Sequence, residues 1–205
     1  MSAALDGPRR GRPRDESLDR AVTACVLELV AEGGLAALTM EAVASRAGVG
    51  KATVYRRWAN RDELIRDALA TLNDDLPPAE GATTRERLVS LVAGMAALKE
   101  QQPLSMRVFP RVMSHRRSDP QTYACFYERV LQPRRERFLR ELREGVRIGD
   151  IRSDVDLEQA VTLLVGPMLY QVTVLPADAP AASLTPERVV DLVLNGIGGA
   201  ASTTA

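Results

Sequence analysis

Two short helical patterns that meet at Gly48 constrain the fold of this chain more than any other feature. Two helices joined by a tight turn need a small residue where they cross, a glycine in the turn and apolar positions that lock them together. Ala44 supplies the small residue, and Gly48 follows it at the turn. The apolar positions of the inner face are Val43, Ala47, Val49 and Val54. Because several offsets agree at once, the sequence predicts a helix-turn-helix motif.

The pair Gly50-Lys51 also suggests the end of a phosphate-binding loop, which would make this stretch a nucleotide site. That motif needs a glycine five positions before Gly50 and a Ser or Thr directly after the lysine. The chain has Ser45 and Ala52 at those positions, and the residues before them show no β-branched run. Both ends of the loop motif fail, so the sequence favours a helix start over a nucleotide site.

The second helix of the motif leaves a polar and basic outer face. Its members are Lys51, Thr53, Tyr55, Arg56 and Arg57. Lysine and arginine neutralise phosphates, whereas hydroxyl and phenol groups form shorter-range hydrogen bonds that fix the register on a duplex. Thr39 begins the first helix of the motif, where a hydroxyl and a backbone N–H can hold a phosphate. This face either contacts DNA or is a solvated basic surface, whereas Trp58, four residues after Val54, is predicted to be core.

Positive charge is local rather than general, because the formal net charge of the 205 residues is zero. The first 14 residues form a polar arm that contains the run RGRPR, with Arg12 and Arg14 on either side of a proline. An extended, arginine-rich segment can enter the narrow minor groove of DNA. The alternative is a disordered tail that adds only non-specific attraction.

Helical patterns account for the rest of the chain, and no alternating strand pattern occurs in the sequence. Apolar residues from Leu18 to Val30 predict a first helix, the third is expected from about Gly50 to Trp58, and Asn60 with Glu63 marks the start of a fourth. Thr83 and Glu86 form a capping box after the break at 73–84.

Prolines limit the expected helices in the middle of the chain. Pro110 should restrict its region to short helices, because proline lacks an N–H donor and clashes with the preceding turn. A long helix from Tyr123 should be kinked or restarted at Pro133, and two further helices follow.

Catalytic and metal-binding chemistry has little to build on in this sequence. Cys25 and Cys125 lack metal-like spacing and are expected to be buried, reduced thiols. His115, the single histidine, is expected on the surface of a loop, with a pH switch or a ligand contact as the alternative. We therefore expect no enzyme, no metal and no cofactor. Without a secretory leader or a membrane-spanning run, the expected location is the cytoplasm, with no membrane partner.

The run from Ala21 to Leu69 resembles the DNA-binding domain of the TetR/AcrR family of transcriptional repressors. The matching pieces are G-x-x-x-L-T-M-x-x-V-A-x-x-A-G-V, K-x-T-V-Y-R-x-W and N-R-D-E-L. Two positions depart from the pattern. Gly50 stands where many members have serine, which removes a hydroxyl contact to phosphate, and Arg61 stands where many have lysine, which keeps the charge. Segments 149–171 and 184–197 also resemble the C-terminal domain of one branch of the family.

The resemblance implies an all-α homodimer that binds a palindromic operator in double-stranded DNA and is released by a small-molecule effector. The expected division is a basic arm (1–14), a three-helix helix-turn-helix DNA-binding domain (15–72) and a helical effector-binding and dimerisation domain (73–205). An activator or architectural DNA-binding protein without small-molecule control is the alternative. The expected DNA-binding residues are Arg12, Arg14, Thr39, Gly50, Lys51, Thr53, Tyr55, Arg56, Arg57 and Arg61.

Methionine and aromatic side chains in the middle of the chain suit an adaptable apolar pocket for an apolar or amphipathic effector, although at helical spacing such side chains are more often plain core. The expected pocket residues are Met95, Met106, Phe109, Met113, Tyr123, Phe126, Tyr127, Met168 and Tyr170. The last two helices are predicted either to form a four-helix dimer seam or to be internal core. Their candidate positions are Val161, Leu164, Val165, Met168, Leu169, Val189, Leu192, Val193 and Ile197.

Overall fold

The computed structural model describes residues 16–35, 38–74, 76–101, 103–175 and 184–195, and within these ranges the chain is helical without a strand. The expected all-α fold is therefore confirmed. The α-helices are α1 (Glu16–Gly33), α2 (Met40–Arg46), α3 (Lys51–Tyr55), α4 (Arg61–Ala70), α5 (Thr84–Gln101), α6 (Pro103–Ser114), α7 (Pro120–Phe126), α8 (Gln132–Ile148), α9 (Leu157–Thr173) and α10 (Pro186–Asn195). A 3-10 turn, Thr71–Asn73, follows α4, and a π-helical turn, Tyr127–Leu131, precedes α8.

Local capping chemistry sets the starts of three helices, as the sequence predicts. The Oγ1 atom of Thr39 accepts a hydrogen bond from the backbone N–H of Ala42 at 3.0 Å and so begins α2. Asn60 accepts from the N–H of Glu63 at 2.9 Å and begins α4. Thr83 and Glu86 exchange hydrogen bonds between side chain and backbone at the start of α5. Each bond satisfies an N–H that has no partner inside its helix.

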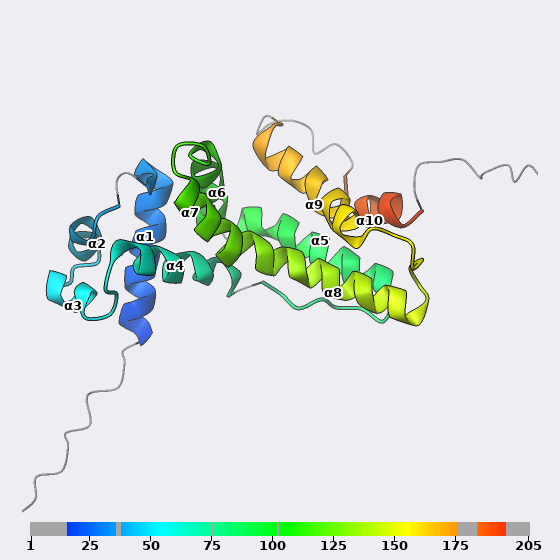
Figure 1. The fold of residues 1–205 in the computed structure, drawn as a ribbon, viewed down its shortest axis with the longest axis horizontal. Helices are drawn as coiled ribbons and strands as arrows, with labels where there is room; N and C mark the ends of the chain where they lie inside the picture. The colour runs from blue at the N-terminus through cyan, green and yellow to red at the C-terminus, as the bar shows by residue number, and fades with distance from the viewer. Residues whose placement is uncertain (1–15, 36–37, 75, 102, 176–183, 196–205) are drawn as a thin grey trace, which may run out of the picture.

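Helices α1 to α4 form one end of the molecule (Figure 1). Their core contains Val22 and Val54 and is closed by Trp58, which is 1% exposed as the sequence predicts. The indole Nε1 of Trp58 donates to Asp67 of α4 at 2.9 Å, so the buried polar tip of this ring has its partner. These four helices we call the head.

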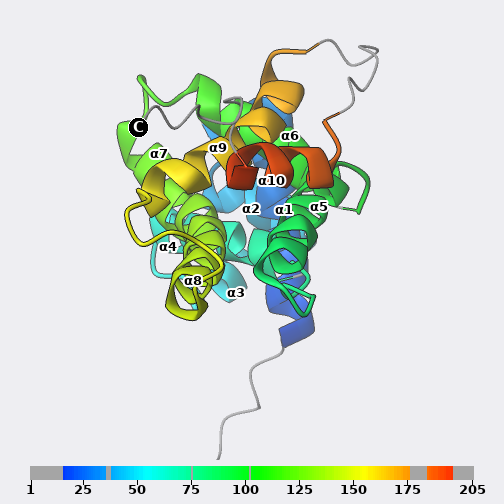
Figure 2. The ribbon, with the colours of Figure 1, turned by 90° about the vertical axis from the view of Figure 1, so that its right-hand side faces the viewer.

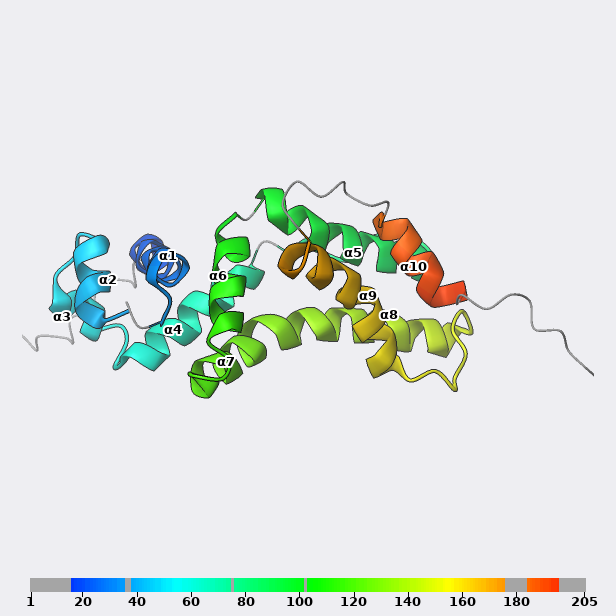
Figure 3. The same cartoon turned by 90° about the horizontal axis from the view of Figure 1, so that it is seen from above.

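Helices α5 and α8 run along the long axis of the rest of the molecule, and α9 and α10 lie over them on one side (Figures 2 and 3). The hydroxyl of Thr84 at the start of α5 donates to Asp150, just beyond the end of α8, at 2.7 Å, so the two helices are antiparallel. Their core includes Leu88, Phe138 and Leu164.

The head shares its core with part of the second half of the chain. Val108, Phe109 and Val112 of α6 and Phe126 of α7 pack in the same apolar cluster as α1 and α4. Helices α6 and α7 are therefore packed between the head and the long helices, as the view from above shows (Figure 3).

Two expectations about prolines need correction or refinement. Pro110 lies inside the 12-residue helix α6, so the expectation of only short helices there is wrong. Val108, Phe109 and Val112 beside it are 0%, 9% and 1% exposed, and burial of that face offsets the lost backbone hydrogen bond. Pro133 does restart a helix, because α8 begins at Gln132 after the π-helical turn.

The cysteines and the histidine are less simply placed than the sequence suggests. Cys25 and Cys125 are free thiols that are half-buried rather than buried, and partial burial raises the pKa of each. His115 is also half-buried, in the turn after α6, and not on an open surface loop. Its Cε1 lies 3.4 Å from where a Cβ on Gly34 would be, and Gly34 has a φ of 68°, so the ring packs against the end of α1.

Candidate nucleic-acid interface and effector cavity

The turn between α2 and α3 depends on glycine at position 48. Gly48 has a φ of 65°, which side chains with a Cβ rarely adopt. The N–H of the next residue, Val49, then donates to the carbonyl of Ala44 at 3.0 Å and draws the two helices together. Val43 and Val54 are fully buried between them. The helix-turn-helix predicted from the spacing of these residues is present.

Three polar side chains of the motif face outward at the end of the molecule. Lys51, Tyr55 and Arg56 are exposed, and the Tyr55 ring is 49% exposed although it is large and apolar in part. Thr53 is half-buried beside them. Lys51 lies 3.4 Å from Glu41 of α2, and the pKa of Glu41 is lowered by a backbone N–H and by this ammonium group. The outer face therefore offers positive charge and hydroxyl groups together.

Two arginines expected to contact DNA, Arg57 on this face and Arg61 at the start of α4, have partners within the head. The guanidinium of Arg57 pairs with Asp19 of α1 and is only 13% exposed, so its expected place on the outer face is wrong. Arg61 is half-buried, and its Nε and Nη2 atoms donate to the carbonyls of Leu38 and Leu35 at 2.9 and 2.6 Å. Arg61 thus fixes the segment that leads into α2.

The remaining DNA-binding candidates lie at helix starts or outside the described residues. Thr39 is exposed at the N-terminus of α2, and Gly50 is the exposed N-cap of α3, with no side chain to cap it. Arg12 and Arg14 lie outside the described residues. Arg46, which is basic and close to the motif, forms a two-point ion pair with Glu32, and this raises the pKa of the guanidinium. Its charge is therefore offset within the head.

A cavity of about 250 Å³ lies where α5, α6, α8 and α9 meet beside the π-helical turn. Its wall is mostly apolar or aromatic, and its polar groups belong to two arginines, a serine, a threonine and the tyrosine Tyr127. The lining residues are Met95, Leu98, Ser105, Met106, Phe109, Phe126, Tyr127, Leu131, Arg134, Arg135, Val161, Thr162, Val165, Gly166, Met168 and Leu169. A concave, apolar wall with few polar groups is the usual form of a small-molecule site.

Six of the nine pocket candidates named from the sequence lie on this wall. They are Met95, Met106, Phe109, Phe126, Tyr127 and Met168. Met113 and Tyr123 instead pack against the core that the head shares with α6 and α7. Tyr170 is 52% exposed and lies off the wall.

Sequence reasoning missed Arg134, which is the most unusual residue of the wall. It is 9% exposed, and its Nε donates to Oδ1 of Asn73 at 2.8 Å while Nη2 donates to the carbonyl of Leu72 at 2.9 Å. Leu72 and Asn73 belong to the 3-10 turn that directly follows α4, the last helix of the head. The sequence did hold a sign that Arg134 is buried. It lies four residues after Val130 and four before Phe138, so the three side chains share one helix face, and both apolar members are buried.

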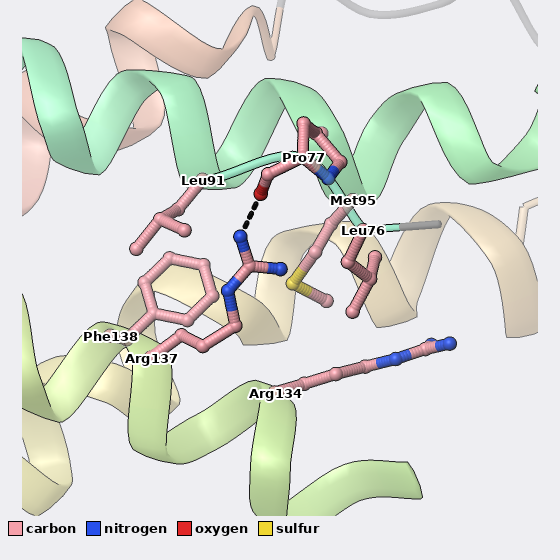
Figure 4. Close-up of a pocket in the computed structure, with 8 residues that line it drawn as sticks. Leu76, Pro77, Leu91, Met95, Arg134, Arg137 and Phe138 are labelled. Carbon is pink, nitrogen blue, oxygen red and sulfur yellow. Dashed lines mark hydrogen bonds between the residues drawn. The ribbon is translucent and has the colours of Figure 1, made fainter. Parts of the chain in front are cut away.

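A second, much smaller hollow lies behind Arg134. It measures about 10 Å³, about the space of one water molecule, so it holds no effector. Figure 4 shows Arg134 extended beneath Leu76 and Met95, and Arg137 turned the other way to donate to the carbonyl of Pro77. The two neighbouring arginines of α8 therefore point to different segments.

Helices α9 and α10 also present an apolar surface outward. Leu163, Tyr170 and Val174, at a spacing of seven and four, are 60%, 52% and 59% exposed. Leu192 of α10 is 48% exposed. Of the positions named as seam or core, Val161, Leu164 and Val189 are buried within the single chain, which is the core alternative. Ile197 lies outside the described residues. The outward residues of both helices form what we call the α9–α10 face.

Two family models match the chain. The model described as "Tetracyclin repressor-like, C-terminal domain" matches residues 77–193, and "Bacterial regulatory proteins, tetR family" matches residues 26–68. The chain belongs to the TetR family of transcriptional regulators. Members of this family are DNA-binding regulators and not enzymes.

Individual TetR-family proteins are similar over most of the chain. The HTH-type transcriptional regulator YdeS of Bacillus subtilis is 29% identical, over 96% of each chain. The DNA-binding transcriptional repressor TetR of Mycobacteroides abscessus is 29% identical over 70% of this chain and 75% of its own. Among solved structures, FadR of Bacillus subtilis with stearoyl-CoA has a TM-score of 0.68 at 20% identity, covering 87% of this chain and 99% of its own.

Neither a metal cluster nor a membrane-spanning helix is found in the part of the chain that the structure describes. In those residues no group of three or more His, Cys, Asp or Glu side chains is placed to hold a metal ion. Over the same part of the chain, no helix has the length and apolar character needed to cross a membrane.

Proposed function

We propose that this TetR-family regulator is a repressor that binds a palindromic operator as a homodimer and leaves it when a small molecule fills the cavity. The division into an arm (1–14), a DNA-binding domain (15–72) and an effector-binding and dimerisation domain (73–205) belongs to this proposal. In it, α6 and α7 are parts of the effector domain that rest on the head.

The DNA-binding step uses the outer face of α3. The exposed Lys51 and Arg56 neutralise phosphates, and Tyr55 and Thr53 give hydrogen bonds that fix the register of the helix in the major groove. Thr39 and Gly50 add backbone N–H groups at the starts of α2 and α3. Arg57 and Arg61 act indirectly in this scheme, because their side chains hold α1 and the segment before α2.

The effector step is carried by one observation: the cavity wall is bonded directly to the end of the head. Arg134 lines the cavity and donates hydrogen bonds to both residues that end the 3-10 turn after α4. A molecule that enters the cavity therefore contacts a side chain whose position is tied to α4. Binding that favours one arrangement of this contact changes the preferred position of the head, which is a coupling between two sites. The FadR neighbour of similar fold was solved with stearoyl-CoA.

The dimer step uses the α9–α10 face. Exposed apolar side chains in a contiguous stripe are typical of a protein interface. A two-fold pairing through α9 and α10 makes a four-helix contact and gives two heads for the two halves of a palindrome.

The test uses the DNA upstream of the chain's own gene and the purified full-length protein. We expect salt-sensitive binding to a palindrome there, measured by fluorescence anisotropy at physiological salt. Lys51→Ala and Tyr55→Phe should each weaken binding by about 5- to 100-fold, as the loss of one phosphate or positioning contact does. Unchanged affinity in both variants would refute the assignment of α3. Operator binding that no small molecule reverses would favour an activator or an architectural protein.

A further inference from the structure

Arg134 is a buried cation on the wall of a largely apolar cavity. Its side chain is 9% exposed, and its hydrogen-bond acceptors are neutral oxygen atoms: Oδ1 of Asn73, the carbonyl of Leu72 and, at 3.5 Å, the hydroxyl of Ser105. These bonds use the Nε and Nη2 atoms of the guanidinium. Nη1, the third nitrogen of the guanidinium, donates no hydrogen bond to any of the described residues.

No carboxylate balances this charge within the described part of the chain, in contrast to Arg135 on the same wall, which pairs with Glu158. The charged group that acts on Arg134 is another cation, Arg137. Burial, with a smaller effect from Arg137, lowers the pKa of Arg134 to about 10, so the guanidinium remains charged at neutral pH.

A purely structural role does not explain why this residue is charged. The bonds to Leu72 and Asn73 tie α8 to the head, but a neutral donor such as glutamine can make such bonds without burying a charge. A buried charge is costly unless a partner of opposite sign accompanies it. The cavity supplies the space for such a partner, because Arg134 lies on its wall.

We propose that the effector of this protein is an amphipathic carboxylate, whose anionic group pairs with Arg134 while its apolar body fills the cavity. The inference rests on the proposed effector-released function and specifies its ligand. Arginine suits this task, since its planar fork matches a carboxylate with two parallel hydrogen bonds. Phe109, Phe126 and Val161 line the space that receives the apolar body. The cavity volume of about 250 Å³ is close to the lower end of the range of small-molecule pockets, which suits a short apolar body.

The probes for the test are octanoate and 1-octanol, which have the same chain but differ in charge, with 4-phenylbutyrate and 4-phenyl-1-butanol as a second pair. Both acids are ionised at pH 7.5, well above the usual carboxyl pKa. Calorimetric titration of the full-length protein should show each carboxylate binding about 10- to 100-fold more tightly than its alcohol, the range of a buried charge-assisted hydrogen bond. This comparison uses the unmodified chain and needs no variant to fold.

Two neighbouring variants then locate the effect. Arg134→Met should bring the ratio of the two affinities to about one, because it keeps an apolar stem and removes the charge. Arg135→Met is the matched control: it removes a cation from the same wall, but one that Glu158 already neutralises, so the ratio should persist. Equal affinity for acid and alcohol in the unmodified protein, no detectable binding of either acid, or a ratio that survives Arg134→Met would each overturn the proposal.

Release of operator DNA is measured separately, so that the two proposals can fail independently. Carboxylates that bind through Arg134 without releasing DNA would support the ligand chemistry and overturn effector release. Neutral compounds that release DNA, with no binding of carboxylates, would support effector release and overturn the role of Arg134.

Discussion

Arginine side chains in this protein differ in role according to what they pair with. Arg56 is exposed on α3, Arg57 beside it is paired with Asp19 inside the head, and Arg134 is buried among neutral acceptors. Sequence alone does not separate Arg56 from Arg57, because the two are adjacent and chemically identical. The role of each arginine depends on its partner, and the partner of Arg57, Asp19, lies 38 residues earlier in the chain.

Replacing these two adjacent arginines should affect different properties: Arg57→Ala the stability of the fold, and Arg56→Ala the affinity for DNA. Arg57→Ala removes the guanidinium that pairs with the half-buried carboxylate of Asp19 and should lower the free energy of unfolding by about 1–3 kcal/mol. Arg56→Ala removes an exposed side chain and should change stability by less than about 0.5 kcal/mol. It should instead weaken DNA binding and reduce the dependence of log affinity on log salt by about one. Chemical denaturation and anisotropy titrations over a salt series measure both quantities; the same response from both variants would contradict the assignment.

At the scale of elements, the start of α8 shows how one side chain supports an irregular helix. In a regular helix the N–H of residue 133 would bond the carbonyl of Arg129, but Pro133 has no N–H. Nδ2 of Asn73 donates to that carbonyl at 2.8 Å and to the carbonyl of Val130 at 3.4 Å. The last residue of the 3-10 turn after α4 thus supplies a donor in place of the backbone N–H that α8 lacks.

A double-mutant cycle tests this replacement. Asn73→Ala should lower the free energy of unfolding by about 1–3 kcal/mol, because the Arg129 carbonyl loses its donor. Pro133→Ala restores an N–H at residue 133. In that background, Asn73→Ala should lower the free energy of unfolding by at least about 1 kcal/mol less than it does in the unmodified protein. This difference is well above the usual error of additivity. The bond from Arg134 to Asn73 is lost in both backgrounds and cancels. A cost that is the same in both, by chemical denaturation, would show that Asn73 acts only through Arg134.

Helix starts were predictable from sequence because their causes are local. Thr39, Asn60 and the pair Thr83 and Glu86 cap helices over three residues, and each prediction is confirmed. The helix that passes through Pro110 was not predictable, because its stability comes from packing against distant helices. The exposed set Lys51, Tyr55 and Arg56 followed from helical spacing. The environment of Arg134 did not, because its partner Asn73 lies 61 residues away.

At the scale of the whole molecule, the head and the rest of the chain are joined by a shared core and by a polar contact. Helices α6 and α7 pack in the apolar cluster of the head, while Arg134 and Asn73 connect α8 to the end of α4. The cavity lies beside both connections, and helices α9 and α10, which carry the exposed apolar face, lie over the long helices, with α10 at the end far from the head (Figure 1). An effector in the cavity is therefore placed between the surface that reads DNA and the surface proposed to pair subunits.

The α9–α10 face predicts which substitution separates the subunits. Leu163 is 60% exposed in the single chain and lies in the middle of α9. In a two-fold dimer it is buried twice, so its loss removes about 3–6 kcal/mol of apolar stabilisation. Leu163→Glu should therefore weaken the dimer by about 100-fold or more, measured by analytical ultracentrifugation over a concentration series.

A second exposed aliphatic residue provides the control for this experiment. Ile148 is 48% exposed but lies at the end of α8 and not on α9 or α10, so Ile148→Glu should leave the association constant unchanged. Each monomer of the Leu163→Glu variant keeps an intact head, because the face and the head share no residue. It should therefore still bind one half of the palindrome, with the weak affinity of a single site, and lose the gain that comes from two linked heads. A dimer that survives Leu163→Glu, or one that Ile148→Glu disrupts equally, would move the subunit contact away from α9 and α10.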